Sequence, residues 1–456
     1  MAFWNAVMSS TIAIEGRFDG EYYSPFYSNM DEALSKVSCV DNLGRLVHSM
    51  RKGIFDISPK LYRNKGIPLV RTLQIKSPLL SKESLVYIDA KDHKEHFNKT
   101  ELTSGDIVFT KIGAGIGDVA VLPTDYKIYN FSQNVAGVSI NREKIDGFYL
   151  LAYLATKWGR NQLLRYMMPS GQGKLELRDI KKIKVVRLGN SEAEIANLIS
   201  CAEKSVRESQ EKYLSAVSLL QSELGLDKLT FQKPVSYLTY FSEIEIFRRT
   251  DPEFFHVRYE PFLSSARGYT LGWNTLGAMT SRTLPNFDAR KHSINFEYIE
   301  IGDINVGNGS YKTTTIYSKD LPANAKIELS GGEILLSQVR PARGAIAITK
   351  DIFDHPTICS GAFYVCTAND VNHREIIWLY LRTVKDVFEK YCGGTSYPTI
   401  DSRYIAKFPV PLFSSDLAVR IQDLVLASKQ AQQKSDELLE QAKTRVEQLI
   451  EAAVQP

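Results

Sequence analysis

Short runs of β-branched and aromatic residues, broken by glycine, proline, asparagine and aspartate, fill the first part of the chain. This pattern is typical of strands separated by turns. We predict strands over residues 84–88, 107–112, 119–122 and 135–140. Apolar residues at spacings of three and four then predict a helix over residues 148–166. Together these elements predict a mixed α/β globule within residues 1–190.

The same order of elements returns in the second part of the chain. We predict strands over residues 296–301, 334–339, 345–348 and 362–366. A helix is predicted over residues 375–391. A second mixed α/β globule is therefore expected within residues 229–413.

Individual motifs repeat together with the elements. The run Arg17–Tyr23 returns as Arg249–Phe255, with the order Arg-x-Asp-x-Glu-aromatic-aromatic kept. The run Gly105–Ile112 returns as Gly332–Val339, at an offset of 227 residues (332 − 105). An offset that drifts by only a few residues over a whole half indicates a duplicated domain. A period this long excludes a solenoid of short repeats.

A long helix is predicted after each globule, over residues 191–228 and 414–456. Ser191 with Glu194, and Ser415 before Asp416, are helix start signals. At ~1.5 Å per residue each helix would be roughly 50 Å long. Both helices share one heptad-like register. In the first helix its positions are Ile195, Ile199, Ala202, Val206, Ser209, Tyr213, Ala216 and Leu220. In the second helix they are Ile421, Val425, Ser428, Gln432, Ser435, Leu439, Ala442, Val446 and Leu449.

The two helices are natural partners for each other, because both seams lie in one chain and share a register. We therefore predict that they pair within the chain. The alternative is a coiled coil that joins separate chains.

Composition permits a polyanionic partner without requiring one. The 456 residues include 56 Lys and Arg against 52 Asp and Glu, a formal net charge of +4. Apolar runs fall far short of the ~20 residues of a membrane span, and the N-terminus shows no secretory signal. The five cysteines include no C-x-x-C pair, so we expect reduced thiols in a cytoplasmic chain. Cys359 and Cys366 fall in strand-like segments and are expected in the core.

Motifs that carry chemistry are mostly absent. The glycine run Gly113–Gly117 precedes a strand rather than a helix, so it predicts a tight turn and not a phosphate loop. His93 and His96 lie in a lysine-rich stretch, which predicts a solvated loop rather than half a metal site. We predict no catalytic and no metal-ligating residues. This absence, in a duplicated chain, favours binding over catalysis.

Three further segments occur in the same order in both halves: Val70-Arg71 and Tyr298–Ile304, Gly105–Ile107 and Gly332–Ile334, and Ser170–Gly173 and Gly394-Thr395. With these segments, the two globules and their helices resemble the specificity subunit of a type I restriction-modification system. The resemblance implies an α+β fold class with two tandem mixed α/β target-recognition domains. It also implies that the long helices pair as an antiparallel coiled coil.

The same resemblance implies a sequence-specific DNA-binding subunit that reads a bipartite target in phage defence. It implies a non-catalytic chain that works with double-stranded DNA, two methyltransferase subunits and restriction/translocase subunits, and with no membrane. No cofactor is expected on this chain; S-adenosylmethionine, ATP and Mg are expected in the partner subunits. Three alternatives stay open: a recognition module of another DNA-modification or phage-defence complex, an enzyme with degenerate motifs, and a duplicated structural or carbohydrate-binding protein.

Candidate DNA contacts are sought where the two copies differ, because shared residues should build the scaffold. Lys and Arg bind phosphates, and Arg, Lys and Gln also read bases. The candidates are Arg51, Lys52, Lys60, Arg63, Lys65, Gln172 and Lys174 in the first half and Arg282, Arg290, Lys291, Arg340, Arg343 and Tyr397 in the second. The alternative for any one of them is an ordinary solvated side chain. The aromatic pairs Tyr22-Tyr23 and Phe254-Phe255 are expected in the core.

Overall fold

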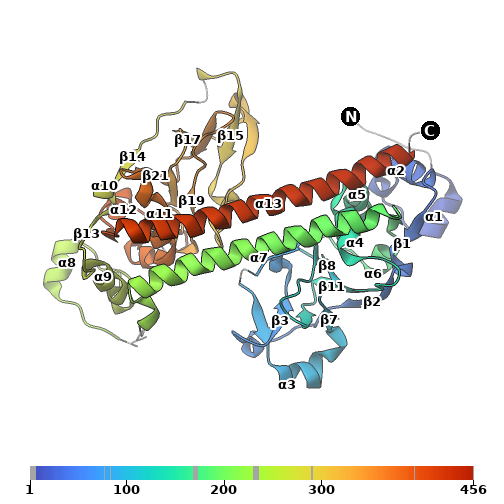
Figure 1. The fold of residues 1–456 in the computed structure, drawn as a ribbon, viewed down its shortest axis with the longest axis horizontal. Helices are drawn as coiled ribbons and strands as arrows, with labels where there is room; N and C mark the ends of the chain where they lie inside the picture. Colours follow the sequence, from blue (N-terminus) through green and yellow to red (C-terminus); the bar gives the residue numbers. More distant parts are fainter. Residues whose placement is uncertain are drawn as a thin grey trace. The chain divides into compact units, whose positions relative to one another are not determined.

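A computed structural model of the chain divides it into two compact units (Figure 1). Unit 1 comprises residues 1–207 and 431–456, and unit 2 comprises residues 208–430. The residues that the structure describes are 7–76, 78–82, 84–113, 115–167, 173–229, 236–288, 291–394 and 396–454. Each unit contains one α/β globule and a part of each long helix.

The main sheet of unit 1 has six strands in the order β2-β11-β8-β9-β5-β4. Their bounds are β2 (Val47–Lys52), β4 (Ile75–Lys76), β5 (Leu79–Leu80), β8 (Ile107–Thr110), β9 (Val119–Val121) and β11 (Val135–Ile140). Successive side chains of a strand point to opposite faces. Phe109 and Ala136 thus belong to the core that includes helices α4 (Gly147–Ala155) and α5 (Lys157–Arg165). Val108 and Val135 belong to a separate core with residues of the second sheet.

The second sheet of unit 1 has the order β6-β3-β10-β7, in which only β3 and β10 run parallel. A short antiparallel pair, β1 with β12, lies outside both sheets. The strands are β1 (Val40–Asn42), β3 (Ile67–Val70), β6 (Val86–Ile88), β7 (Leu102–Thr103), β10 (Ile128–Phe131) and β12 (Lys184–Val186), and the remaining helices are α1 (Ser9–Glu15), α2 (Pro25–Ser35), α3 (Ala90–Asp92) and α6 (Leu177–Ile180).

Unit 2 repeats most of this topology. Its sheets have the orders β14-β21-β18-β19 and β16-β15-β20-β17. Among the described residues the first sheet has no counterparts of β4 and β5, and the second sheet again has one parallel pair, β15 with β20. The strands are β13 (Trp273–Thr275), β14 (Thr280–Thr283), β15 (Asn295–Ile299), β16 (Thr314–Tyr317), β17 (Ala325–Leu329), β18 (Ile334–Ser337), β19 (Ile346–Ile348), β20 (Thr357–Ser360), β21 (Phe363–Ala368), β22 (Cys392–Gly393), β23 (Thr399–Ile400) and β24 (Pro409–Pro411). The short helices are α8 (Phe241–Phe247), α9 (Glu260–Arg267), α10 (Leu276–Met279), α11 (Arg374–Thr383) and α12 (Ser402–Ala406). The predicted fold class and the duplication are confirmed.

The predicted helix over residues 148–166 is wrong in one respect, because Thr156 divides it into α4 and α5. Thr156 is extended (ψ 165°), and its Oγ1 accepts a hydrogen bond from Gly159 N (3.3 Å) as the cap of α5. A Cβ on Gly159 would lie 2.5 Å from Leu154 Cα. Glycine therefore lets α5 turn back onto α4. The predicted helix 375–391 is divided as well, into α11 and a 3₁₀ helix over Lys385–Tyr391.

The repeated Arg-x-Asp motif is structural. The Arg17 guanidinium donates to both carboxylate oxygens of Asp19 (2.9 and 2.7 Å) and to the main-chain oxygen of Tyr166 at the end of α5 (3.1 Å). Arg249 holds Asp251 in the same way (2.7 and 2.7 Å). Each arginine lowers the pKa of its aspartate. The motif thus fastens the start of each globule to a helix end.

Side chains that were expected in the core are mostly there. Tyr22, Tyr23 and Phe254 are buried as predicted, whereas Phe255 is only partly buried. Cys359 and Cys366 are buried on β20 and β21, and burial raises the pKa of Cys366 to about 12. All five cysteines have free thiols.

The long helices α7 (Ser191–Glu223) and α13 (Ser415–Val454) pair within the chain. In unit 1 the start of α7 shares a core with the end of α13, through Ile195, Ile199, Ala442, Val446 and Ile450. In unit 2 the end of α7 shares a core with the start of α13, through Ala216, Leu220, Ile421 and Val425. The pairing is therefore antiparallel, as predicted. The seam ends on Ile450 rather than Leu449, which is only partly buried.

One seam position predicts a gain in stability. Ser435 is fully buried, and its Oγ has no hydrogen-bond partner in the part of the chain that the structure describes. A buried hydroxyl without a partner costs about 1–3 kcal/mol, and alanine is the better helix former. We expect Ser435→Ala to raise the free energy of unfolding by about 1 kcal/mol in urea denaturation.

Ser428 is the matched control for this prediction. Its Oγ lies 3.1 Å from Ser209 Oγ and donates to the Ser209 main-chain oxygen (2.8 Å). Ser428→Ala should therefore lower the free energy of unfolding by about 1 kcal/mol. Equal effects of the two substitutions would contradict the assignment of Ser435 as unsatisfied.

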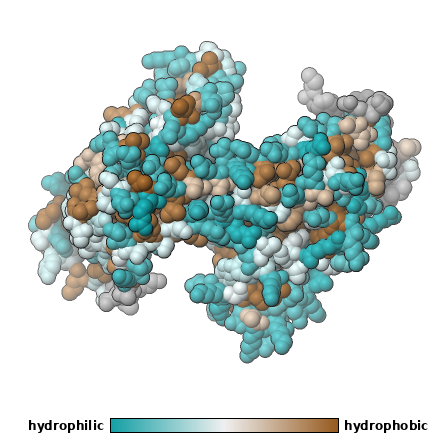
Figure 2. Space-filling model, in the orientation of Figure 1, coloured by the Kyte–Doolittle hydropathy of each residue, from teal (hydrophilic) through white to brown (hydrophobic). Residues whose placement is uncertain are grey.

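The surface is mainly hydrophilic with scattered hydrophobic residues (Figure 2). Helix α8 is an exception, because its Phe241, Ile246 and Phe247 are exposed. Among the helices that the structure describes, none is long and apolar enough to span a membrane.

Candidate nucleic-acid interface

Each unit places the turn after its central strand beside a short segment from later in the chain. In unit 1, Ile112 pairs with Lys174, and Leu175 N donates to the Lys111 main-chain oxygen (3.0 Å). In unit 2, Val339 pairs with Thr399, and Ile400 N donates to the Gln338 main-chain oxygen (2.9 Å). We name the two side-chain clusters here turn site 1 (Lys52, Lys111, Lys174, Glu176) and turn site 2 (Arg282, Gln338, Arg340, Tyr397).

The turn itself has the predicted form. Gly117 N donates to the Thr110 main-chain oxygen (3.0 Å), which closes the turn between β8 and β9. Gly117 (φ 80°) and Gly344 (φ 88°) are both left-handed, which glycine adopts without strain. The prediction of a tight turn is confirmed.

Turn site 1 gathers lysines from three segments. Lys52, at the end of β2, lies opposite Ala136, which in turn lies opposite Phe109. Because side chains alternate along a strand, Lys111 projects to the same face as Phe109 and Lys52. Lys174 pairs with Glu176 (2.5 Å), and this contact lowers the pKa of Glu176. Lys52 and Lys174 were predicted, and the structure brings them together.

Lys111 was missed by the sequence analysis. Its side chain is 4% exposed, and its ammonium makes no hydrogen bond or ion pair with any described residue. Burial, followed by the charges of Lys52 and Lys174, lowers the pKa of Lys111. One difference between the copies could have pointed to Lys111: the position 227 residues later is Gln338, a neutral residue (338 − 111 = 227). Both residues belong to the repeated strand motif, which was interpreted as scaffold.

The other candidates of the first half lie on exposed loops and strand ends. Arg51 Nη1 donates to the Lys99 main-chain oxygen (2.8 Å). Arg63 Nη1 donates to the main-chain oxygens of Lys60 (2.8 Å) and Tyr62 (3.1 Å), so Arg63 stiffens the loop that carries Lys60. Arg51, Lys60, Arg63 and Lys65 are all exposed.

Turn site 2 combines arginines with aromatic rings. The Arg282 guanidinium lies 4.9 Å from the centre of the Tyr364 ring, and its Nη1 donates to Ser402 Oγ (3.1 Å). Arg340 lies 5.0 Å from the centre of the Tyr397 ring, which is 61% exposed. Exposed guanidinium–aromatic pairs can bind phosphates and stack on bases. Arg282, Arg340 and Tyr397 thus lie where a nucleic acid could reach them.

The backbone of Arg340 is left-handed (φ 48°), whereas Gly113 (φ 124°) occupies the corresponding place in unit 1. A non-glycine residue in this region costs about 1 kcal/mol or more. We expect Arg340→Gly to leave the melting temperature unchanged or higher, and to weaken duplex binding because the guanidinium is lost. Differential scanning fluorimetry and fluorescence anisotropy would measure the two effects.

Arg343, in the same turn, provides the control. Its φ is not positive, so Arg343→Gly should lower the free energy of unfolding by about 0.5–1 kcal/mol. A fall in stability for Arg340→Gly as large as that for Arg343→Gly would contradict the assignment of strain to Arg340.

The remaining candidates of the second half are not brought into turn site 2 by any contact described. Arg343 is exposed in the turn, and Lys291 is exposed in a loop where its main-chain N donates to Asp288 O (3.1 Å). Gln172 and Arg290 lie outside the described residues. The DNA contacts of all candidates stay predictions.

The predicted solvated loop at His93 is wrong. His93 is buried, with Nε2 2.9 Å from Glu101 Oε2 and Nδ1 2.6 Å from the side-chain amide of Asn130. The neighbouring elements enclose the ring because these two polar partners satisfy both nitrogens. His96 is exposed, as expected. No group of three or more His, Cys, Asp or Glu suited to a metal occurs among the described residues.

A known protein family matches the first globule of the chain. Residues 40–186 match the family model described as "Type I restriction modification DNA specificity domain". This range begins with β1, ends with β12 and includes both sheets of unit 1. Residues 40–186 are therefore similar to a type I restriction-modification DNA specificity domain. The resemblance to the specificity subunit is confirmed by this match.

Two solved structures are similar over most of the chain. One is the type I restriction-modification S subunit from M. genitalium, with 12% identity, 91% of this chain and 96% of that chain covered, and a TM-score of 0.42. The other is the HsdS subunit from Thermoanaerobacter tengcongensis, with 15% identity, 91% and 96% covered, and a TM-score of 0.28. No curated protein matches the chain.

All first-half candidates, and Lys111, lie within the specificity domain of residues 40–186. Unit 2 repeats the order of four strands of the first sheet and the whole order of the second sheet, with the parallel pair at the same place. The chain therefore carries this two-sheet arrangement twice.

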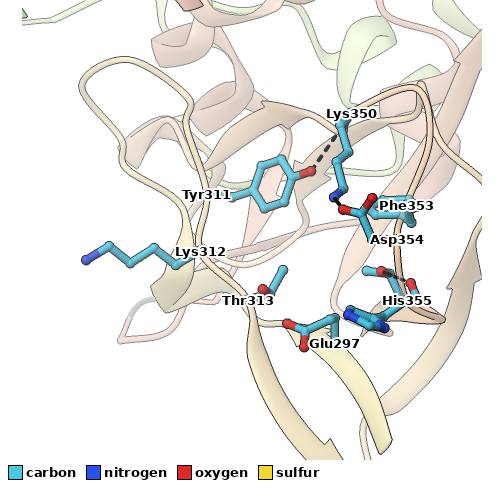
Figure 3. Close-up of a pocket in the computed structure, with 9 residues that line it drawn as sticks. Glu297, Tyr311, Lys312, Thr313, Lys350, Phe353, Asp354 and His355 are labelled. Carbon is cyan, nitrogen blue, oxygen red and sulfur yellow. Dashed lines mark hydrogen bonds and ion pairs between the residues drawn. The ribbon is translucent and has the colours of Figure 1, made fainter. Parts of the chain in front are cut away.

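Unit 2 also has a cavity of about 620 Å³ at its second sheet (Figure 3). Three of its charged groups are engaged with neighbours: Lys350 pairs with Asp354 (2.6 Å), and Glu297 accepts a hydrogen bond from Thr315 Oγ1 (2.5 Å). Hydrogen bonds from Thr313 and Thr315 lower the pKa of Glu297. A general acid or base needs a pKa near the working pH, so this carboxylate is poorly suited to either role. The cavity resembles a polar recess of the specificity-domain surface rather than an active site.

Proposed function

We propose that this chain is the DNA-binding specificity subunit of a type I restriction-modification complex and reads a bipartite target. The observation that carries the proposal is that one two-sheet arrangement, matched in its first copy by the specificity-domain family, occurs twice with different side chains at the same turn. Turn site 1 presents lysines, and turn site 2 presents arginines and a tyrosine. Two readers with one scaffold and different contacts are suited to two different half-sites.

In this proposal residues 1–190 and 229–413 are the target-recognition domains, and α7 and α13 set the gap between half-sites. The helices have 33 and 40 residues, hence roughly 50 and 60 Å at ~1.5 Å per residue. At ~3.4 Å per base pair the shorter length is comparable to about 15 base pairs. A helix pair of this length can hold two readers one helical turn or more apart.

The chain would be non-catalytic, with two methyltransferase subunits and restriction/translocase subunits docked on it. The exposed apolar side chains of α8 support a protein partner. S-adenosylmethionine, ATP and Mg would be bound by those partners and not by this chain. The complex acts on the cell's own DNA, so we expect the chain in the cytoplasm.

Copurification tests the assembly. A tagged chain, isolated from its source cells, should bring a methyltransferase that methylates DNA only when both proteins and S-adenosylmethionine are present. Copurification with a different DNA-modification or phage-defence protein would favour a recognition module of that complex instead. Methylation or cleavage by the isolated chain would contradict the non-catalytic role.

A further inference from the structure

Lys111 is a largely buried lysine of unit 1, with two other lysines and one carboxylate near it. The side chain is 4% exposed and has no hydrogen bond or ion pair with a described residue. Burying a charge without a partner is costly, and proteins normally pair such a group. An anion from outside the chain would supply the missing partner.

The charged groups around Lys111 favour an anion. Lys52 faces it from β2, and Lys174 and Glu176 face it from the segment before α6. Glu176 is already engaged with Lys174 (2.5 Å). Three ammonium groups against one carboxylate leave a net positive charge at turn site 1. Lys52 is exposed and Lys174 partly exposed, so an anion can approach from solvent.

Unit 2 does not repeat this arrangement. Gln338 occupies the place of Lys111, and its Nε2 donates to the main-chain oxygen of Ile400 (3.3 Å). The neutral amide is thus satisfied within the chain. The partly exposed Lys174 is replaced by Thr399, which pairs with Val339 as Lys174 pairs with Ile112. The two copies therefore differ in charge at the same point of one scaffold.

We propose that Lys111, Lys52 and Lys174 bind one phosphate group of the DNA backbone, and that unit 2 lacks this phosphate site. The inference rests on the proposed function, because that function identifies the anion as duplex DNA. Lysine ammonium groups bind phosphate as point charges, and such contacts position a protein on DNA without reading bases. Lys111 would thus set the position of the first domain on its half-site.

Proton linkage follows from this geometry. Burial and the two neighbouring lysines lower the pKa of Lys111 in the free protein. A phosphate beside the ammonium favours its charged form and raises that pKa again. Binding therefore takes up protons between the lowered pKa and the pKa of the complex, and affinity should fall as pH rises through this window. Below the window Lys111 is charged in both states, and the dependence should vanish.

Salt dependence of DNA binding gives the decisive readout. Each phosphate contact contributes about −0.9 to the slope of log affinity against log salt concentration. With the full chain and the proteins that copurify with it, we would titrate a fluorescent 40-base-pair duplex over a salt series. Lys111→Gln should make the slope shallower by about 1 and remove the pH dependence described above. Gln338 shows that the scaffold accommodates glutamine at this place.

Two further variants complete the experiment. Lys52→Gln, at an exposed position, should make the slope shallower without any risk to the fold. Lys36→Gln is the matched control, because Lys36 is exposed at the C-terminal cap of α2 and pairs with Glu32 (3.3 Å) away from turn site 1. An unchanged slope for both Lys111→Gln and Lys52→Gln, with normal binding by the unsubstituted chain, would overturn the phosphate site alone. Failure of the unsubstituted complex to bind any duplex would overturn the proposed function itself.

Discussion

Replacing Arg382 with alanine should lower the free energy of unfolding of unit 2 by about 3–5 kcal/mol. The side chain is buried, and its guanidinium is fully hydrogen-bonded. Nε donates to Tyr213 Oη of α7 (2.9 Å). Nη1 and Nη2 donate to four main-chain oxygens at distances between 2.8 and 3.2 Å, those of Val306, Gly307, Gly344 and Ile346.

The loss is large because one side chain satisfies several buried carbonyls at once. Alanine would remove a donor from each of these oxygens, would leave those of Val306 and Gly307 with no donor among the described contacts, and would open a cavity beside Trp378. Hydrogen-exchange mass spectrometry of β18–β21 peptides in increasing urea would measure the effect. Arg403→Ala is the control, because Arg403 is exposed and bonds only Asp401 in the described structure, so its loss should change stability by less than about 0.5 kcal/mol. Similar losses for both variants would contradict the role of Arg382.

Exchanging residues 229–413 for the corresponding segment of a related chain should change one half of the methylated target and leave the other half and the gap intact. The reason is that the two globules have separate cores and different contacts at the same turn. Because α7 and the seam of α13 are kept, the spacing should not change. Methylome sequencing of cells that carry the exchanged chain would measure the result.

The reciprocal exchange of residues 1–190 is the control, and it should change only the opposite half. Loss of both halves in one exchange, with the protein folded and present at normal levels, would contradict the assignment of one half-site to each globule.

The duplication, the strands and the paired helices could be predicted from sequence because each depends on repeated local patterns. The same offset that aligned Gly105 with Gly332 aligns β8 with β18 in the structure. The break at Thr156 could not be predicted from apolar spacing. It depends on a side-chain cap and on the close approach of Gly159 to Leu154, which only the folded chain shows.

The candidate interface was less accessible to sequence analysis. Lys52 and Lys174 are 122 positions apart (174 − 52), and only sheet register and the pairing of Ile112 with Lys174 bring them to one face. Lys111 was hidden in a scaffold motif, where burial rather than residue type marks it out. His93 shows the same limit, because its buried partners Glu101 and Asn130 follow it by 8 and 37 positions.

The central claim is that this chain gives a DNA-modifying complex its sequence specificity. Single-molecule methylome sequencing of the source strain, with and without this gene, tests it most directly. The account predicts that deletion removes methylation at one split motif, two short half-sites around a fixed gap, and that the unsubstituted gene restores it. An unchanged methylome in a strain whose neighbouring methyltransferase is active would contradict the account.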